Sequence, residues 1–217
     1  MYESYAYWAG IEARSGYGKV KRDVAAFDPA SPREYLSPIV DACQKNFQII
    51  ISNGPATDNS SSLAKAQALL TGIQNNSAPT QINIPAPDDG MENNWADEYA
   101  RYMSSGDCNP NIAGTQRVVT YVIEVNPGTN KSDRAMTALM NSTATSGKGR
   151  YFAVSAGADG TDGTQIAAAL QSIFTEIQAV NSVFASRCTA AIRSAATMPV
   201  AAIASIPSMR ACRTAST

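Results

Sequence analysis

The chain has 217 residues, 44% of them hydrophobic and 16% charged, with 17 basic and 18 acidic side chains and a formal net charge of −1. This is ordinary globular composition, and because the basic residues are scattered rather than gathered on a stripe, nucleic acid is excluded as an expected partner. The chain has no histidine, which removes the usual general base and the usual partner of a Ser or Cys nucleophile. We therefore predict a protein that is not an enzyme.

Membrane insertion is not expected either. No run approaches the roughly 20 apolar residues that a membrane span needs. Residues 1–10 also lack the basic start and apolar stretch of a signal peptide. The acidic residues Asp88, Asp89 and Glu92 lie in a stretch rich in Pro and Gly, which is typical of a solvated loop.

Three apolar runs predict buried strands. They are rich in β-branched residues and two of them stop at Asn-Gly-Pro or Asn-Pro-Gly. The predicted strands are Asn46–Ser52, Val118–Val125 and Tyr151–Val154.

Six segments predict helices. Tyr2–Trp8 is aromatic at helical spacing and is followed by Gly10, and Ser37-Pro38 has the pattern of an N-cap followed by a first-turn proline. The others have apolar residues at helical spacing. The predicted helices are Tyr2–Trp8, Ile39–Cys43, Leu63–Ile73, Trp95–Met103, Ser132–Asn141 and Ile166–Val180.

Strands that alternate with helices predict an α/β fold, with an open, mostly parallel, Rossmann-like sheet and helices on both faces. Only three strands are predicted, and parallel strands are normally covered by neighbours. We therefore expect the sheet to be incomplete on its N-terminal side.

The composition changes near residue 187. All acidic residues lie at or before Glu176, whereas residues 187–217 contain four Arg, two Cys and no acid. Pro199 and Pro207 interrupt any helix there. We predict one domain over residues 1–186 and an unstructured basic tail over 187–217, which is either a linker or the product of out-of-frame translation.

The order of several segments resembles the PilC/PilY family of type IV pilus assembly and tip-associated adhesins. The segments are YESYAYWAG, SPIVDACQKNFQIIISNG, NNWADEYARYM, VVTYVIEV, ALMNSTATSGKGRYFAV and IAAALQSIFTEIQAVNSVFAS. The resemblance covers residues 2–186 and departs from the family after NSVFAS. In that family this region is similar to a von Willebrand factor A (VWA) domain and a β-propeller follows it, so the resemblance implies that the chain is the C-terminal part of a VWA-like domain.

The resemblance also implies a function. It predicts a non-catalytic binding or adhesion module of an exported protein, found in the periplasm, the outer membrane or the pilus tip. The implied partners are minor pilins or other pilus proteins, a host or abiotic surface, and the propeller of the parent protein. The alternatives are an inactive truncated remnant of such a protein and a VWA-like protein-binding domain of another exported protein.

A VWA metal site takes oxygen ligands from three loops at the carboxyl edge of the sheet. By this resemblance Asn53 occupies a position that usually holds Asp, and a neutral amide is a weaker ligand for a hard cation. Asp58 opens an Asp-x-Ser-x-Ser string, but it begins five residues after Asn53, so we interpret it as a helix cap. We expect no cofactor in this chain; binding of Mg²⁺ or Ca²⁺ would require the intact protein.

Two cysteines fall at the same end of the predicted sheet. Cys43 precedes the first strand, and Cys108 lies just upstream of the second. If these strands are neighbours, a disulfide is geometrically plausible, and closing that loop would stabilise the fold by roughly 4 kcal/mol. The alternative is two buried thiols. Cys188 and Cys212 lie in the predicted tail.

Overall fold

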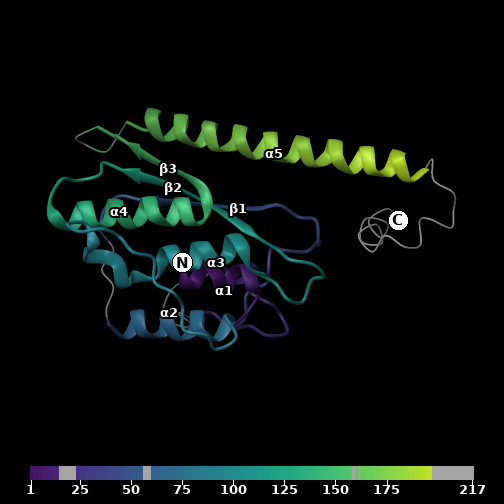
Figure 1. Cartoon of the computed structure of the whole chain (residues 1–217), viewed down its shortest axis with the longest axis horizontal. Helices are drawn as coiled ribbons and strands as arrows, with labels where there is room; N and C mark the ends of the chain where they lie inside the picture. Colours follow the sequence, from purple (N-terminus) through teal and green to yellow (C-terminus); the bar gives the residue numbers. More distant parts are fainter. Residues whose placement is uncertain (15–22, 56–59, 158–159, 161, 197–217) are drawn as a thin grey trace. The chain divides into compact units, whose positions relative to one another are not determined.

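A computed structural model describes residues 1–14, 23–55, 60–157, 160 and 162–196 of the chain (Figure 1). The chain divides into two compact units, Met1–Ala169 and Leu170–Thr217. No helix in the described part of the chain is long and apolar enough to cross a membrane. The main elements are α1 (Tyr2–Ala9), β1 (Asn46–Ser52), α2 (Ser60–Ile73), α3 (Ala96–Ser105), β2 (Val118–Val125), α4 (Lys131–Ser146), β3 (Lys148–Val154) and α5 (Thr164–Ala196).

The three strands form one sheet in the order β1-β2-β3, and both pairs are parallel. Helices flank this sheet, so the predicted α/β class with an open parallel sheet is confirmed (Figure 1). The β1–β2 register runs without interruption from Asn46 beside Val118 to Ser52 beside Glu124. The β2–β3 register is irregular between Thr120 and Val122.

Strand β3 begins three residues earlier than predicted, at Lys148. The reason is the close approach of Gly149 to β2. A Cβ atom at Gly149 would lie 2.1 Å from the carbonyl oxygen of Thr120. Only glycine lets the two backbones pair here, whereas in a sequence pattern glycine argues against a strand.

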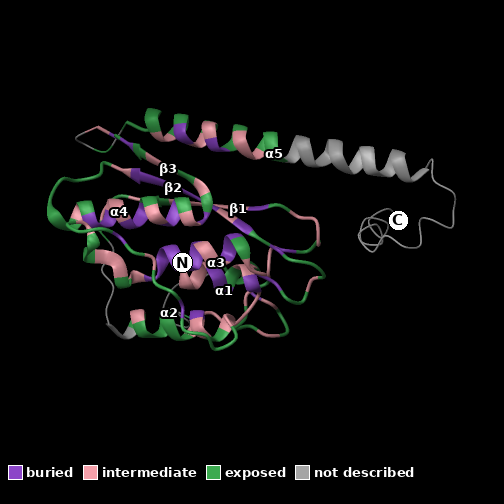
Figure 2. Ribbon diagram, viewed as in Figure 1, coloured by how far each residue is buried: buried purple, intermediate pink, exposed green. Residues whose placement is uncertain are grey.

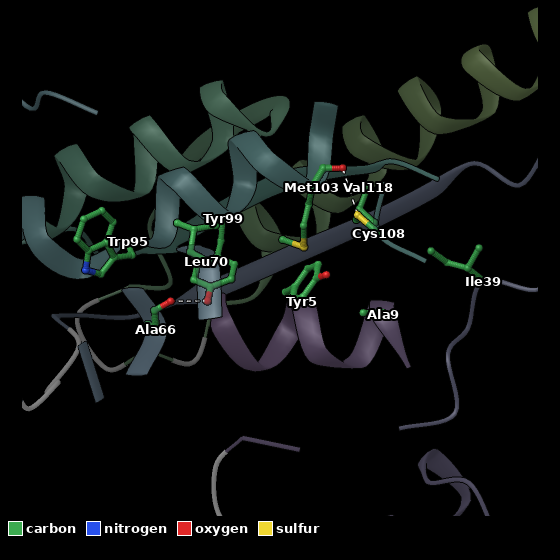
Figure 3. Close-up of a cluster of buried hydrophobic side chains, with 10 residues drawn as sticks. All are labelled: Tyr5, Ala9, Ile39, Ala66, Leu70, Trp95, Tyr99, Met103, Cys108 and Val118. Carbon is green, nitrogen blue, oxygen red and sulfur yellow. Dashed lines mark hydrogen bonds between the residues drawn. The ribbon is translucent and has the colours of Figure 1, made fainter. Parts of the chain in front are cut away.

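One face of the sheet is covered by α1, α3 and α4, with α2 packed behind α1 and α3. Gln48 of β1 contacts α1, and Val122 of β2 packs in a cluster with Met136 and Leu139 of α4. Figure 2 shows buried residues along β2 and on parts of α3 and α4. A second cluster, called the aromatic cluster here for its buried rings, joins α1, α2 and α3 (Figure 3); its largest members are Tyr5, Leu70, Trp95, Tyr99 and Met103.

Hydrogen bonds and ring contacts orient the helices that meet in this aromatic cluster. The Tyr99 hydroxyl donates to the carbonyl of Ala66 at 2.6 Å, which ties α3 to α2 (Figure 3). Tyr5 of α1 meets the ring of Tyr102 edge-on, with the centroids 5.8 Å apart. Edge-on aromatic pairs add roughly 0.5–1.5 kcal/mol beyond the area they bury, so the cluster fixes α1 against α3.

The predicted helix Ile39–Cys43 is wrong: the structure has a loop there. The Gln44 side chain replaces the helical hydrogen bonds, since its Oε1 accepts from Val40 N at 3.1 Å and its Nε2 donates to Pro38 O at 2.9 Å. A five-residue segment gains too few backbone bonds to offset helix nucleation.

The other predicted helices are present with different ends. Helix α1 ends at Gly10 in the left-handed conformation, with φ of 66°, as the glycine predicted. Helix α4 continues to Ser146, five residues beyond the prediction. Helix α5 continues to Ala196, so residues 187–196 of the predicted tail belong to a helix, and the predicted tail over residues 187–217 stays a prediction. Residues 197–217 of the predicted tail lie outside the described residues.

Candidate functional site at the carboxyl edge of the sheet

The carboxyl ends of all three strands meet at one edge because the strands are parallel. The segments that leave this edge are Ser52-Asn53-Gly54 after β1, Asn126-Pro127-Gly128 after β2 and Ser155-Ala156-Gly157 after β3. Open α/β sheets bind their ligands outside this edge. It is therefore the candidate functional site of the first unit.

Asn126 holds two strand exits together. Its backbone adopts the left-handed conformation, with φ of 51°. Its Oδ1 accepts from Ala156 N at 2.8 Å, and its Nδ2 donates to Gly157 O at 3.2 Å. The backbone N–H of Asn126 also donates to Val154 O at 2.8 Å. The amide of Asn126 is thus engaged in clamping the β2 exit to the β3 exit.

The exit from β3 is closed by hydrogen bonds to the start of α5. The N–H of Ser155 donates to Gln165 Oε1 at 2.8 Å, and Asp162 N donates to Ala156 O at 2.9 Å. The Asp162 carboxylate accepts from Thr164 N at 2.9 Å, and hydrogen bonding by Thr164 lowers the pKa of Asp162. Asp162 therefore acts as a cap of α5.

The exit from β1 contains the predicted metal position. The Asn53 side chain is exposed, and the neighbouring Ser52 hydroxyl donates to Gly54 O at 3.2 Å. Asp58, the second residue considered for a metal, lies outside the described residues. Within the described ranges, no group of three His, Cys, Asp or Glu side chains is placed to hold a metal ion.

The acidic side chain at the end of β2 points inward. Glu124, the penultimate residue of β2, is buried. Its carboxylate accepts from the Tyr151 hydroxyl at 2.6 Å and from the Thr137 hydroxyl at 3.0 Å. Burial, together with the Glu124 carboxylate, raises the pKa of Tyr151. Glu124 thus joins β2 to β3 and α4, and it is not offered to a ligand.

A second buried acidic pair lies at the N-terminus of α3. Asp97 and Glu98 are 1% and 0% exposed. Glu98 Oε1 accepts from Ile82 N at 2.6 Å, and Asp97 Oδ2 accepts from the Ser142 hydroxyl at 2.5 Å. Burial, followed by the hydrogen bond with the Asp97 carboxyl, raises the pKa of Glu98 to about 8. Glu98 thus attaches the loop around Ile82 to α3, and Asp97 attaches α3 to α4.

The sequence contained a signal for Glu98 that the prediction did not use. Trp95, Tyr99 and Met103 mark the buried stripe of α3, and Glu98 falls within it, three residues after Trp95 and one before Tyr99. A carboxyl on an apolar stripe is buried with its helix face. For Asp97 and Glu124 no comparable spacing distinguishes a buried carboxylate from a solvated one.

The predicted disulfide between Cys43 and Cys108 is absent from the structure. Cys108 is buried in the aromatic cluster, and its thiol donates to the carbonyl of Met103 at 3.5 Å (Figure 3). Burial raises the pKa of Cys108 to about 12. Cys43 is half-buried in a turn in which its N–H donates to Asp41 Oδ1 at 2.7 Å. The structure therefore has the two-thiol arrangement.

Comparison with protein-family models, with curated proteins and with solved structures found no match to this chain. The edge itself offers exposed amide, hydroxyl and backbone groups; its exposed amides are those of Asn53 and Asn126, and the Asn126 amide is already hydrogen-bonded to the β3 exit. Such groups recognise a partner by uncharged hydrogen bonds.

Proposed function

We propose that this chain is a non-catalytic binding module of a type IV pilus biogenesis and tip-associated protein of the PilC/PilY kind. It would act outside the cytoplasm, at the pilus tip or the outer membrane, with a minor pilin or another pilus protein as its partner. The module would be the C-terminal part of a VWA-like domain.

The observation that carries this proposal is the correspondence between the family-like segments and the elements of the sheet. CQKNFQIIISNG contains β1 and its exit, VVTYVIEV is β2, and GKGRYFAV contains β3. YESYAYWAG forms α1, and NNWADEYARYM contains most of α3. A resemblance that follows strands and their exits in chain order is more specific than one scattered over loops.

The chemistry of the candidate site supports binding in preference to catalysis. Two of the three exits of the edge are used for structure, since Asn126 clamps β3 and Asp162 caps α5. The buried carboxylates Asp97, Glu98 and Glu124 hold loops and helices together. None of these groups is placed beside a second acid or base at the exposed edge.

Localisation on pili tests the cellular part of this proposal. Antibodies raised against the chain are applied to intact piliated cells of the source organism, and bound antibody is located by immunogold electron microscopy. We expect label at pilus tips and at the outer membrane, and its loss in a strain with the gene deleted. Label confined to the cytoplasm of sectioned cells would overturn the proposal.

Binding to purified pilins tests the molecular part. The full chain is immobilised, and soluble domains of the minor pilins and of the major pilin of the same organism are passed over it. We expect saturable binding of at least one minor pilin and none of the major pilin, which serves as a control for pilin surfaces in general. Equal binding of both would contradict a specific module.

A further inference from the structure

The exit from β1 contains the only Asn-Gly pair in the sequence, Asn53-Gly54. The Asn53 side chain is exposed, and Gly54 is half-buried. In such a pair the backbone nitrogen of glycine can reach the side-chain carbonyl carbon of asparagine, because glycine has no Cβ to hinder the approach. The pair is therefore a candidate site of covalent change at the carboxyl edge of the sheet.

The surroundings of the pair leave the reacting atoms accessible. A Cβ atom built at Gly54 would meet no atom within 4 Å, so there is room for a ring to close there. Within the described ranges, neither the Gly54 N–H nor the Asn53 amide makes a hydrogen bond. The Ser52 hydroxyl donates to the Gly54 carbonyl at 3.2 Å, which leaves the Gly54 nitrogen free to react.

Asn126, at the exit of the neighbouring strand, has the opposite properties. The next residue is Pro127, which has no N–H and cannot act as the nucleophile. The Asn126 amide is also held at both ends, since its Oδ1 accepts from Ala156 N at 2.8 Å and its Nδ2 donates to Gly157 O at 3.2 Å. Of the two asparagines that directly follow strands at this edge, Asn53 is the reactive one.

We propose that Asn53-Gly54 is a modification site at which Asn53 is converted to aspartate or isoaspartate without an enzyme. The Gly54 nitrogen forms a bond to Asn53 Cγ, and the bond from Cγ to Nδ2 breaks. Nδ2 leaves as ammonia and takes the proton of the Gly54 N–H, so a succinimide ring remains.

Water then opens this ring. Cleavage of the bond between the Gly54 nitrogen and Asn53 Cγ gives aspartate. Cleavage of the bond between that nitrogen and the backbone carbonyl carbon of Asn53 gives isoaspartate. The sum is asparagine plus water to a carboxylic acid plus ammonia, with no oxidation or reduction.

The conversion changes the chemistry of the candidate functional site. The exit segments 52–54, 126–128 and 155–157 contain no charged residue. Either product adds a carboxylate to them, and isoaspartate also lengthens the backbone by a methylene group. A partner that recognises the amide by uncharged hydrogen bonds would then meet a negative charge. This inference goes beyond the proposed function and does not depend on the pilus assignment.

Incubation of the full chain at neutral and at alkaline pH tests the inference. Digestion and peptide mass spectrometry follow each asparagine, since conversion raises the mass of its peptide by about 1 Da. Synthetic peptides containing aspartate or isoaspartate identify the product by retention time. The free peptide IISNGPA gives the rate without the fold, and Asn53→Asp marks the position of the charged product in ion exchange.

We expect Asn53 in the folded chain to convert at a rate similar to that of the free peptide, faster at alkaline pH, while Asn126 stays unchanged. Gly54→Ala should slow the conversion at least about tenfold, because a Cβ then stands beside the attacking nitrogen. The matched control is Gly72→Ala, since Gly72 lies in α2 and also has no atom within 4 Å of a built Cβ. That variant should convert at the rate of the wild type.

Four results would overturn the inference. They are an unchanged Asn53 in the folded chain over a time in which the free peptide converts, and conversion that occurs only in urea. The others are equal conversion of Asn53 and Asn126, and a rate that Gly54→Ala leaves unaltered.

Discussion

Strands β1 and β2 have similarly apolar sequences but very different surroundings. In β2 all residues except Val119 and Val125 are buried, and the strand has a neighbour on each side. In β1 only Asn46 is buried, and one side has no neighbouring strand among the described residues. A run of β-branched residues therefore identifies a strand, but the position of that strand in the sheet determines how much each side chain contributes to the stability of the fold. Matched changes on the two strands test this difference.

The largest contrast is expected between the two thiols that precede these strands. Cys108, before β2, is buried with its pKa raised to about 12, whereas Cys43, before β1, is half-buried. Because the thiolate is the reactive form, we expect Cys108 in the folded chain to react with iodoacetamide about a thousandfold more slowly than in urea. Peptide mass spectrometry follows each cysteine separately, including Cys188 and Cys212. Rapid labelling of Cys108 without denaturant would contradict its burial.

Next in size is the contrast between two isoleucines that are register partners. Ile123 of β2 is 0% exposed and Ile51 of β1 is 55% exposed. Ile123→Ala should lower the free energy of unfolding by about 3–4 kcal/mol through lost burial and a cavity. Ile51→Ala should cost less than about 1 kcal/mol. Urea titration measures both, and equal costs would show that β1 is covered in solution.

The buried carboxyl at the start of α3 gives a pH dependence with a definite sign. The pKa of Glu98 is raised to about 8 in the folded chain, so the unfolded chain releases this proton at lower pH. The stabilisation that Glu98 contributes is fully present below about pH 4.5. It is lost as the pH rises toward 8, at up to about 1.4 kcal/mol per pH unit. Glu98→Gln should flatten that slope in urea titrations between pH 5 and pH 8.

The exposed Glu34 provides the control for this pH series. Glu34→Gln should retain the slope of the wild type. If Glu98→Gln also retains the wild-type slope of stability against pH, a group other than Glu98 causes the pH dependence.

The smallest contrast concerns the asparagines that follow the two strands. Asn126→Ala removes two hydrogen bonds and places alanine in the left-handed conformation, so it should cost about 1–2 kcal/mol. Asn53→Ala removes an exposed amide and should change stability by less than about 0.5 kcal/mol. Thermal melts of the two variants measure the difference. A large cost at Asn53 would indicate a structural role that its exposure does not suggest.

The strands were the most predictable part of the fold. The bounds of β1 and β2 agree with the prediction, because each is an apolar β-branched run with a sharp stop. Strand order and exposure depend on which strands pair across the sheet, and no local pattern encodes that. Long-range contact also explains the early start of β3, where Gly149 meets the backbone of Thr120.

The candidate site was only partly predictable. Parallel strands imply a shared carboxyl edge, so the positions of Asn53 and Asn126 follow from the element order. The clamp made by Asn126 depends on the exact path of the β3 exit, which the sequence does not reveal. The sequence left a disulfide and two thiols open, because both rested on the edge shared by Cys43 and Cys108; the structure has the two thiols. The direction of the Cys108 side chain, into the aromatic cluster, is decided by packing.

The hydrogen bond from Trp8 to Gln48 gives the protein an intrinsic optical probe. The Gln48 amide also donates to the Thr120 hydroxyl at 2.7 Å, so a chain of side chains runs from α1 through β1 to β2. Trp8 is half-buried, whereas Trp95, the other tryptophan, is buried. Tryptophan emission in a Trp95→Phe background would therefore follow the contact between α1 and β1 without any added label.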